Sequence, residues 1–407
     1  MKIILLTVSI LSLILLARYF LYFSNLKTYK PGDLFKAQAT LLSEPRLTNF
    51  YQTFKVDSVT IQVGKYPDFH YGDKLDISGK VEESSFSTKN GKKVKLLVVK
   101  NPEIKKLENK NVLITSSSFI RTRIESTFNF YLPKNESALL FGIVFGGSQG
   151  FDKNLYEDFR KTGVLHVVAA SGMNVTMLAG FVFLLFSYIF KRRQAIILSL
   201  LAVFYYALIS GFTASVLRAA IMGSIVFTAE ILGKRSTALL SLFITAVFML
   251  FAFPELLFDV GFELSFFSTL GILMIKPVFD SFRLIKKHSG FTDDITTTTS
   301  AQIGSLPILV SSFSTYSIIS ILVNAIVLWT IPILMITGGI AALCSIALPF
   351  ASVPFLYISY PLLLYFEKIV QTFSGFPVLN LENVPAAVWA GYYMMLISLV
   401  FLIRKRK

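Results

Sequence analysis

Long apolar runs recur from residue 163 to the C-terminus, and they constrain the fold of this chain more than any other feature. Each run reaches roughly 18 residues or more, which is enough for a helix to cross a hydrocarbon core about 30 Å thick. Only 15% of the residues are charged, whereas a typical soluble domain has about 25%. The sequence therefore predicts a polytopic α-helical membrane protein.

We expect about ten transmembrane helices when an N-terminal run is included. Residues 3–23 are apolar throughout, and Ala17-Arg18-Tyr19 is a poor cleavage site, so residues 1–24 are predicted to be a retained anchor. The segment 317–348 is too long for one straight crossing and contains Pro332, so it is either one broken helix or two segments. The predicted spans after the anchor are 163–190, 194–210, 211–233, 236–253, 260–275, 295–315, 317–348, 355–373 and 386–403.

Basic loops indicate the orientation of these spans. Lys191-Arg192-Arg193, Lys234-Arg235 and Arg404-Lys405-Arg406-Lys407 fall on one side of the membrane when the spans alternate. Because basic residues accumulate in cytoplasmic loops, we expect a multi-pass protein of the cytoplasmic (inner) membrane. Both termini would be cytoplasmic, and residues 25–115 would be extracytoplasmic.

Residues 25–115 differ in pattern from the rest of the chain. Apolar and polar residues alternate over residues 56–63, and β-rich runs recur near residues 35–42, 74–81 and 94–99. Asn90-Gly91 favours a type I′ hairpin turn, because both turn residues must adopt positive φ. About five short strands in this length fit a small all-β domain of the OB-like type.

Lysines surround this predicted turn, and aromatic residues lie nearby in sequence. A basic groove with stacking rings is what sequence-tolerant binding of single-stranded nucleic acid requires. A lysine-rich hairpin also protects a sheet edge from unwanted pairing, and the rings can belong to the core, so both interpretations stay open. The lysines are Lys89, Lys92, Lys93 and Lys95, and the aromatic residues are Phe50, Tyr51, Phe54, Tyr66, Phe69 and Tyr71.

Residues 116–162 are amphipathic, and we expect helices that lie along the membrane surface, interrupted by the glycine-rich turn at 146–150. Residues 163–407 then form the transmembrane domain. Several of its spans carry polar residues, most of them at a similar depth in the membrane and Gln302 deeper. Inserting an arginine into lipid costs at least about 2.5–3.5 kcal/mol of free energy. We expect a shared wet cavity, with Glu263 as the partner of Arg218; separate structural pairs are the alternative. The residues are His166, Ser171, Asn174, Arg218, Glu263, Gln302 and Asn324.

Neither a catalytic nor a metal site is predicted. His166 and Ser171 lie five residues apart and do not share a helix face well, and no Gly-x-Ser-x-Gly turn is present. The histidines His70, His166 and His288 are scattered over different regions. We therefore expect no enzymatic activity and no cofactor.

Four ordered motifs resemble those of the ComEC competence family, the inner-membrane channels of bacterial DNA uptake. Residues 166–172 place a histidine before a Ser-Gly pair, and Ser215-Val216-Leu217-Arg218-Ala219 is similar to a Ser-x-x-Arg-Ala element. Residues 259–266 match Asp-x-Gly-Phe-x-Leu-Ser-Phe, and residues 302–307 resemble a Gln…Pro segment that is followed by Asn324. The similarity covers roughly residues 130–403, and the β domain resembles the family's OB-like domain more loosely.

The resemblance implies a channel for single-stranded DNA during natural transformation. Arg218 would face phosphates, His166 and Asn174 would be neutral hydrogen-bonding groups, and Glu263 would balance Arg218. Many members have a second histidine at the position of Asn174 and commonly glutamine at that of Glu263.

Many members also continue into a metallo-β-lactamase-like domain whose motifs are absent from this sequence. The resemblance therefore implies a channel without its own nuclease. Its partners would be single-stranded DNA, membrane lipid, a separate nuclease, a DNA-receptor protein and a cytoplasmic motor. Two other classes stay open, namely a secondary transporter for a small anion and a membrane-embedded envelope hydrolase that uses His166 or Ser171.

Overall fold

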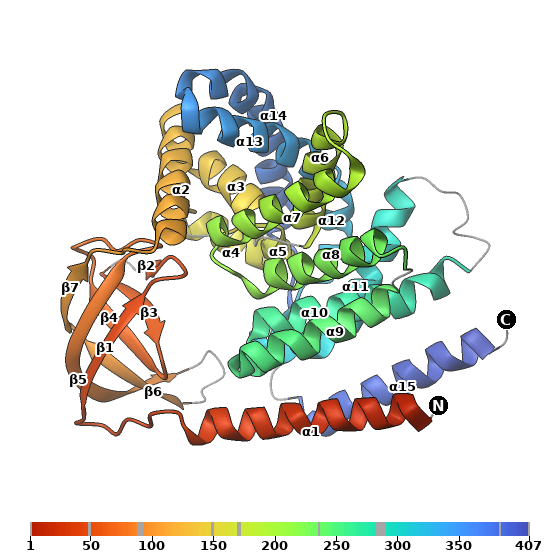
Figure 1. Ribbon diagram of the computed structural model, residues 1–407, viewed down its shortest axis with the longest axis horizontal. Coiled ribbons are helices and arrows are strands. Elements are labelled where there is room, and N and C mark those ends of the chain that lie inside the picture. The colour runs from red at the N-terminus through yellow and green to blue at the C-terminus, as the bar shows by residue number, and fades with distance from the viewer. Residues whose placement is uncertain are drawn as a thin grey trace. The chain divides into compact units, whose positions relative to one another are not determined.

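The chain forms two compact units in a computed structural model (Figure 1). Unit 1 comprises Met1–Arg123 and Ala207–Phe212, and unit 2 comprises Ile124–Tyr206 and Thr213–Lys407. Each unit is described by itself. The structure describes residues 2–47, 50–87, 93–147, 150–168, 172–234, 237–281, 290–381 and 384–405.

Unit 1 contains helix α1 (Lys2–Ser24), seven β strands and the first part of α2 (Val112–Tyr131). The strands are hydrogen-bonded in the order β1-β5-β6-β4-β3-β2, and β7 also pairs with β5. The strand bounds are β1 (Leu34–Thr40), β2 (Arg46–Leu47), β3 (Tyr51–Val56), β4 (Val59–Gly64), β5 (Lys74–Ser87), β6 (Lys93–Lys100) and β7 (Glu103–Leu107).

The long strand β5 bends this sheet into a half-barrel. Its first half pairs with β1 and β7, and its second half pairs with β6. All of these pairs are antiparallel, whereas β4 and β6 run parallel. The predicted all-β domain is confirmed, and the specific OB-like topology stays a prediction.

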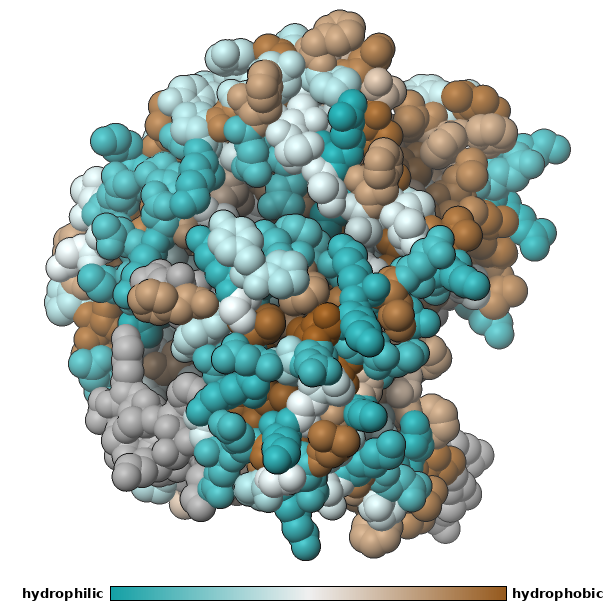
Figure 2. All heavy atoms as spheres, turned by 90° about the vertical axis from the view of Figure 1, so that its left-hand side faces the viewer, coloured by the Kyte–Doolittle hydropathy of each residue, from teal (hydrophilic) through white to brown (hydrophobic). Residues whose placement is uncertain are grey.

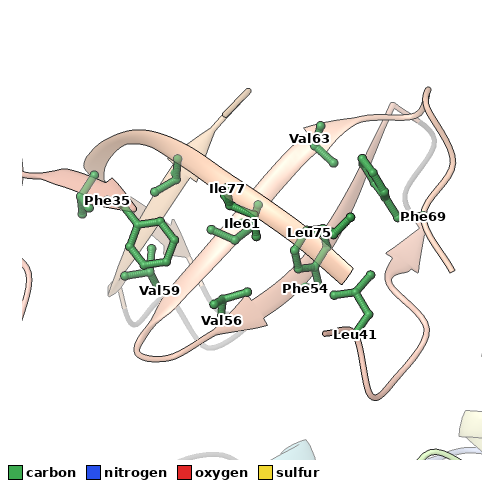
Figure 3. Close-up of a cluster of buried hydrophobic side chains, with 12 residues drawn as sticks. Phe35, Leu41, Phe54, Val56, Val59, Ile61, Val63, Phe69, Leu75 and Ile77 are labelled. Carbon is green, nitrogen blue, oxygen red and sulfur yellow. The ribbon is translucent and has the colours of Figure 1, made fainter. Parts of the chain in front are cut away.

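Alternation along the strands builds the core of the half-barrel. In β4, Val59, Ile61 and Val63 are buried while the residues between them are partly exposed, as the pattern over residues 56–63 predicted. Phe35 and Leu75 close the same cluster from β1 and β5 (Figure 3). Burial of apolar surface at about 25 cal/mol per Å² makes this cluster the main stabilising feature of the domain.

Unit 2 is a bundle of helices. A short pairing of β8 (Thr315–Tyr316) with β9 (Leu379–Asn380) is the one strand ladder among its described residues. The helices are α3 (Lys134–Phe145), α4 (Lys153–Thr162), α5 (Leu165–Val168), α6 (Gly172–Ser187), α7 (Arg192–Ile209), α8 (Ala214–Ile231), α9 (Ala238–Ala252), α10 (Val260–Phe279), α11 (Gly290–Phe313), α12 (Ser320–Val327), α13 (Thr330–Ala347), α14 (Val353–Phe373) and α15 (Ala386–Lys405). The last residues of α7 belong to unit 1.

Six helices among the described residues are long and apolar enough to cross a membrane. Shorter apolar stretches also occur in α1, α9 and α15, at Leu11–Ser24, Ala238–Ala252 and Ala387–Ile403. The class of polytopic helical membrane protein is therefore confirmed, whereas the count of ten spans stays a prediction. The six are Leu165–Ser187, Arg192–Ile209, Ala214–Ile231, Val260–Phe279, Thr330–Ala347 and Pro349–Phe373.

The segment 317–348 contains two helices. Helix α12 ends at Val327 and α13 begins at Thr330, so the break precedes Pro332. Pro332 lies in the first turn of α13, where a backbone N–H would have no helical partner in any case. The proline therefore fits the start of the second helix and does not kink the first.

Helix α3 differs from the amphipathic surface helix that the sequence predicted. Leu139, Leu140 and Ile143 are completely buried, and the helix packs against α13 and α14. A Cβ at Gly338 of α13 would lie 2.8 Å from both Leu140 and Val144, so this glycine permits the close approach. Helix α3 is therefore a core element of the bundle, because its apolar residues surround the whole helix.

Helices α10 and α11 cross at a contact between two glycines. A Cβ on Gly271 would lie 2.9 Å from the Cα of Gly304, and a Cβ on Gly304 would lie 2.5 Å from the carbonyl oxygen of Phe267. Small residues let helix backbones approach closely in membranes. This contact sets the rotation of both helices and thereby the directions of the polar side chains that they carry.

Candidate functional site

Arg218 on α8 is held by neutral groups. Its Nε donates a hydrogen bond of 2.7 Å to Oγ of Ser265 on α10, and its Nη1 lies 3.5 Å from Sδ of Met222. A Cβ at Gly172 would lie 2.8 Å from Nη2, so this glycine leaves the space that the guanidinium occupies. Arg218 forms no ion pair with any carboxylate in the described ranges of the chain.

The predicted pair of Arg218 with Glu263 is therefore wrong. Residues two apart on a helix point about 200° from each other, since each residue advances by 100°. Ser265 faces Arg218, so Glu263 faces elsewhere. The motif that contains both residues also begins the helix, because Oδ1 of Asp259 accepts a 2.7 Å hydrogen bond from the backbone N–H of Phe262.

Gln302 links three elements of the bundle. Its Nε2 donates to Oγ of Ser320 on α12 at 3.0 Å, and its Oε1 accepts from the hydroxyl of Tyr316 at 2.8 Å. Ser320 lies against the turn between α4 and α5, where a Cβ at Gly163 would be 2.6 Å from the Cβ of Ser320. The same turn positions His166, whose Nδ1 is 3.1 Å from the carbonyl oxygen of Gly163.

Asn324 follows Ser320 by one turn on the same face of α12. Its side chain is 0% exposed, and neither amide atom has a hydrogen-bond partner in the described chain. Oγ of Ser317 is likewise buried without a partner there. A buried amide without partners costs about 1–3 kcal/mol. Among the described residues that were predicted to line the channel, Asn324 is therefore the one whose burial the packing of the bundle explains least.

Asn174 has a structural role that the sequence did not indicate. Its Nδ2 donates a 2.6 Å hydrogen bond to the carbonyl oxygen of Ile143. The hydroxyl of Tyr206 donates to the next carbonyl, that of Val144, also at 2.6 Å. The last four carbonyls of a helix lack partners within it, so these two side chains cap the C-terminal end of α3. Ser171 lies outside the described residues.

Two tyrosines that the sequence did not indicate compensate for a proline inside α11, which runs continuously through Pro307. Pro307 has no N–H, so the carbonyl of Ile303 loses its helical partner. The hydroxyl of Tyr392 donates to that carbonyl at 2.8 Å, and the hydroxyl of Tyr393 donates to the carbonyl of Gly304 at 3.1 Å. The signal for this contact was a proline inside a predicted span together with adjacent tyrosines in another.

The predicted DNA contacts of the β domain are only partly described. Lys89 and Lys92 lie outside the described residues, and Lys93 and Lys95 begin β6, where only their backbone is described. Their role stays a prediction. The six aromatic residues differ in burial, because Phe54, Phe69 and Tyr71 are buried, Tyr51 is partly buried, and Phe50 and Tyr66 are exposed.

Unit 1 also contains a charged cluster at the C-terminal turn of α7. The hydroxyl of Tyr71 donates to the carbonyl oxygen of Leu208 at 2.6 Å, and Nη1 of Arg121 donates to that of Ile209 at 2.7 Å. A cation is favourable there, because the C-terminal end of a helix carries partial negative charge. Nε of Arg121 is also 3.4 Å from Oε1 of Glu44.

His70 extends this cluster toward solvent. Its Nδ1 is 3.7 Å from Oε2 of Glu44, and the interaction with this carboxylate raises the pKa of His70 above its ordinary value of 6.5. Burial tends to raise the pKa of Glu44, but the interactions with His70 and with the charge of Arg121 together outweigh burial and lower that pKa. The lowered pKa favours the ionised form of Glu44, which lies between Arg121 and His70.

No group of three or more His, Cys, Asp or Glu side chains that could hold a metal ion occurs in the part of the chain that the structure describes. The polar residues of the bundle described above are hydrogen-bonding groups and one partly buried cation, Arg218. Polar groups of this kind in a set of apolar helices are typical of polytopic membrane proteins that act on polar solutes.

The comparisons with known proteins identify the family. The profile of the Competence protein family matches residues 143–406, well over half of the chain, and the chain belongs to that family. This confirms the resemblance to ComEC proteins that the four motifs indicated.

Two relatives show how far the similarity extends. ComE operon protein 3 of Bacillus subtilis (strain 168) is 27% identical over 230 residues, which are 56% of this chain and 29% of that protein. An uncharacterized protein of Aquifex aeolicus (strain VF5) is 28% identical over 249 residues, which are 61% of this chain and 56% of that protein. The chain thus spans less than two thirds of either relative. No solved structure matches it significantly.

Proposed function

We propose that this protein conducts single-stranded DNA across the cytoplasmic membrane during DNA uptake. The observation that carries the proposal is the environment of Arg218. Its guanidinium contacts a hydroxyl and a thioether and has no carboxylate partner among the described residues, so its charge is not neutralised within the bundle. An arginine in this position is costly in lipid, and a passing phosphate is a ligand that would repay the cost.

The remaining polar groups suit a path for a polyanion. Gln302, Ser320 and Asn324 lie along neighbouring helices and carry no net charge. Neutral hydrogen-bonding groups allow contact with sugars and bases without tight capture, which conduction requires. One cation with neutral neighbours therefore favours a moving polyanion over a small anion that is held in place.

The test is uptake of labelled DNA by a deletion strain that expresses variants of this chain. Arg218→Gln keeps a hydrogen-bond donor near Ser265 and removes the charge, so we expect uptake to fall at least tenfold at normal expression. The matched control is Ser265→Ala, which removes the hydrogen bond and keeps the charge, and we expect it to retain most of the uptake. Normal uptake by Arg218→Gln would overturn the proposal.

The same variants separate the two other classes. A transporter for a small anion would lose saturable uptake of its solute in Arg218→Gln, while DNA uptake would not depend on this protein. An envelope hydrolase would lose activity with His166→Ala and would keep it in Arg218→Gln. We propose that the chain has no catalytic site of its own and acts with a separate nuclease, a DNA receptor and a cytoplasmic motor.

The proposed orientation places the β domain outside the cell and both termini in the cytoplasm. The test is labelling of single cysteines by a membrane-impermeant thiol reagent, in a background where Cys344 is replaced by serine. We expect Asn90→Cys to react in intact cells and Lys407→Cys to react only after permeabilisation. The reverse pattern would overturn the orientation and, with it, the direction of transport.

A further inference from the structure

Two aromatic side chains of the β domain lie on its surface. Phe50 is 80% exposed and Tyr66 is 78% exposed. Tyr51 pairs with Gly64, so both exposed rings lie just beyond the same end of the β3–β4 pair. Leu47 of β2 is exposed near them in sequence. Figure 2 shows a face of the molecule on which hydrophilic residues predominate and hydrophobic residues form smaller patches.

A buried amide shapes the loop that carries Tyr66. The side chain of Gln52 is 0% exposed. Its Nε2 lies 2.8–3.1 Å from the carbonyl oxygens of Gly64, Lys65 and Pro67, and its Oε1 accepts from the backbone N–H of Phe69 at 3.1 Å. The backbone on both sides of Tyr66 is therefore attached to the core of the sheet, and the exposed ring stands on an ordered loop.

A cation accompanies the ring. Nζ of Lys65 lies 6.0 Å from the centroid of Tyr66, and its side chain is exposed. The nearest carboxylate along this loop, that of Asp68, lies 3.9 Å from Nε2 of His70. An unpaired nucleotide offers a flat base and a charged phosphate. An exposed ring on an ordered loop can stack on the base, and the neighbouring lysine can contact the phosphate.

We propose that Phe50 and Tyr66 form a stacking platform for the unpaired bases of single-stranded DNA, with Lys65 as a contact for its phosphates. This inference rests on the proposed function and locates the site at the end of the β3–β4 pair, which is separate in sequence from the lysines of residues 89–95. Every base has a π-face, so the platform takes any sequence. Its ordered loop lowers the entropy that is lost when the rings immobilise a base.

The experiment measures the affinity of the purified full-length protein, in detergent, for two fluorescent probes. One probe is an oligo(dT), and the other is an abasic oligomer of the same length with the same phosphates. The native protein should bind oligo(dT) at least tenfold more tightly than the abasic oligomer. Each of Phe50→Ala and Tyr66→Ala should weaken oligo(dT) binding roughly tenfold, because stacking is worth about 1–3 kcal/mol per base.

Matched variants separate stacking from folding and from charge. Tyr66→Phe keeps the ring and should bind as the native protein does. Leu34→Ala removes another exposed apolar side chain of the β domain, one that is 62% exposed, and should change nothing. Lys65→Ala should weaken binding of both probes alike and lower the slope of log affinity against log salt by about one.

Unchanged oligo(dT) affinity in the Phe50→Ala/Tyr66→Ala double variant would overturn the platform, and so would equal native affinity for the two probes. The proposed function fails by a different result, namely normal DNA uptake in Arg218→Gln. Loss of uptake in Arg218→Gln together with unchanged binding in the double variant would overturn the platform alone.

Discussion

Two buried amides show how differently the two units of this protein treat the same chemical group. Gln52 in the β domain and Asn324 in the helical bundle are both 0% exposed. The amide of Gln52 contacts three carbonyls and one N–H, whereas the amide of Asn324 has no partner among the described residues. The first stabilises a loop, and the second destabilises the bundle unless a water or a substrate meets it.

This difference distinguishes buried polar side chains that stabilise the fold from those that are candidates for a functional contact. A satisfied buried amide specifies one conformation. An unsatisfied one is a cost that folding alone does not explain, and in a membrane helix such a residue is a candidate for contact with a polar solute. The bundle therefore holds the sites whose removal is expected to affect uptake more than folding.

The largest effect is expected from Gln52→Leu. The change removes the two amide N–H donors shared by three loop carbonyls and the acceptor of the Phe69 N–H, so the β domain should lose about 3 kcal/mol or more of its free energy of unfolding. Thermal unfolding of the full-length protein, followed by circular dichroism in the β region, measures the loss. Gln62→Leu is the control, because Gln62 lies on the partly exposed face of β4. An unchanged melting temperature in Gln52→Leu would show that the hydrogen bonds of Gln52 do not stabilise the β domain.

The contrast within the bundle is between Gln302→Leu and Asn324→Leu. Gln302→Leu breaks the bonds to Ser320 and Tyr316 and should cost about 2 kcal/mol. Asn324→Leu replaces an amide that has no hydrogen-bond partner among the described residues by an apolar group of similar volume, so stability should stay equal or rise by about 1 kcal/mol.

Unfolding in detergent and DNA uptake, measured side by side, check this pair of variants. Asn324→Leu should lower uptake at unchanged stability if the amide meets DNA. A marked loss of stability in Asn324→Leu would show that a polar partner does satisfy the amide in the folded protein.

A smaller effect is expected from Tyr392→Phe, which removes the donor to the carbonyl of Ile303 and should cost about 1 kcal/mol. In a Pro307→Ala background the helix can supply its own N–H to that carbonyl, so the same change should cost less. The difference between the two costs in a double-mutant cycle measures the coupling. Equal costs in both backgrounds would show that the tyrosine does not compensate for the proline.

The smallest effect is a pH dependence of the β domain. The pKa of His70 is raised in the folded state, so its contribution to stability is present below about pH 6.5 and is lost as the pH rises through the folded pKa. The melting temperature should therefore fall slightly as the pH rises above about 6.5, and His70→Gln should flatten the profile. A profile of His70→Gln that follows the native one across this range would assign the dependence to another group. The bundle changes described above should leave this dependence unaltered.

The local pattern of apolar and polar residues predicted much of the architecture. The apolar runs after residue 163 predicted the membrane class, and the alternation over residues 56–63 predicted a half-buried strand that the structure shows as β4. The length of the segment 317–348 predicted a break, which occurs between α12 and α13. These features depend on neighbours in sequence, so the sequence alone determines them.

The partners of the polar residues were decided only by tertiary structure. Matching depth made Glu263 the predicted partner of Arg218, yet Ser265 occupies that place. Two residues on one helix lie at nearly equal depth while facing opposite directions, and the rotation that selects between them depends on distant contacts such as that of Gly271 with Gly304. For the same reason the order of aromatic residues in the chain could not separate the buried Phe54 from the exposed Phe50 and Tyr66. Depth and composition follow from position along the chain, whereas direction follows from packing.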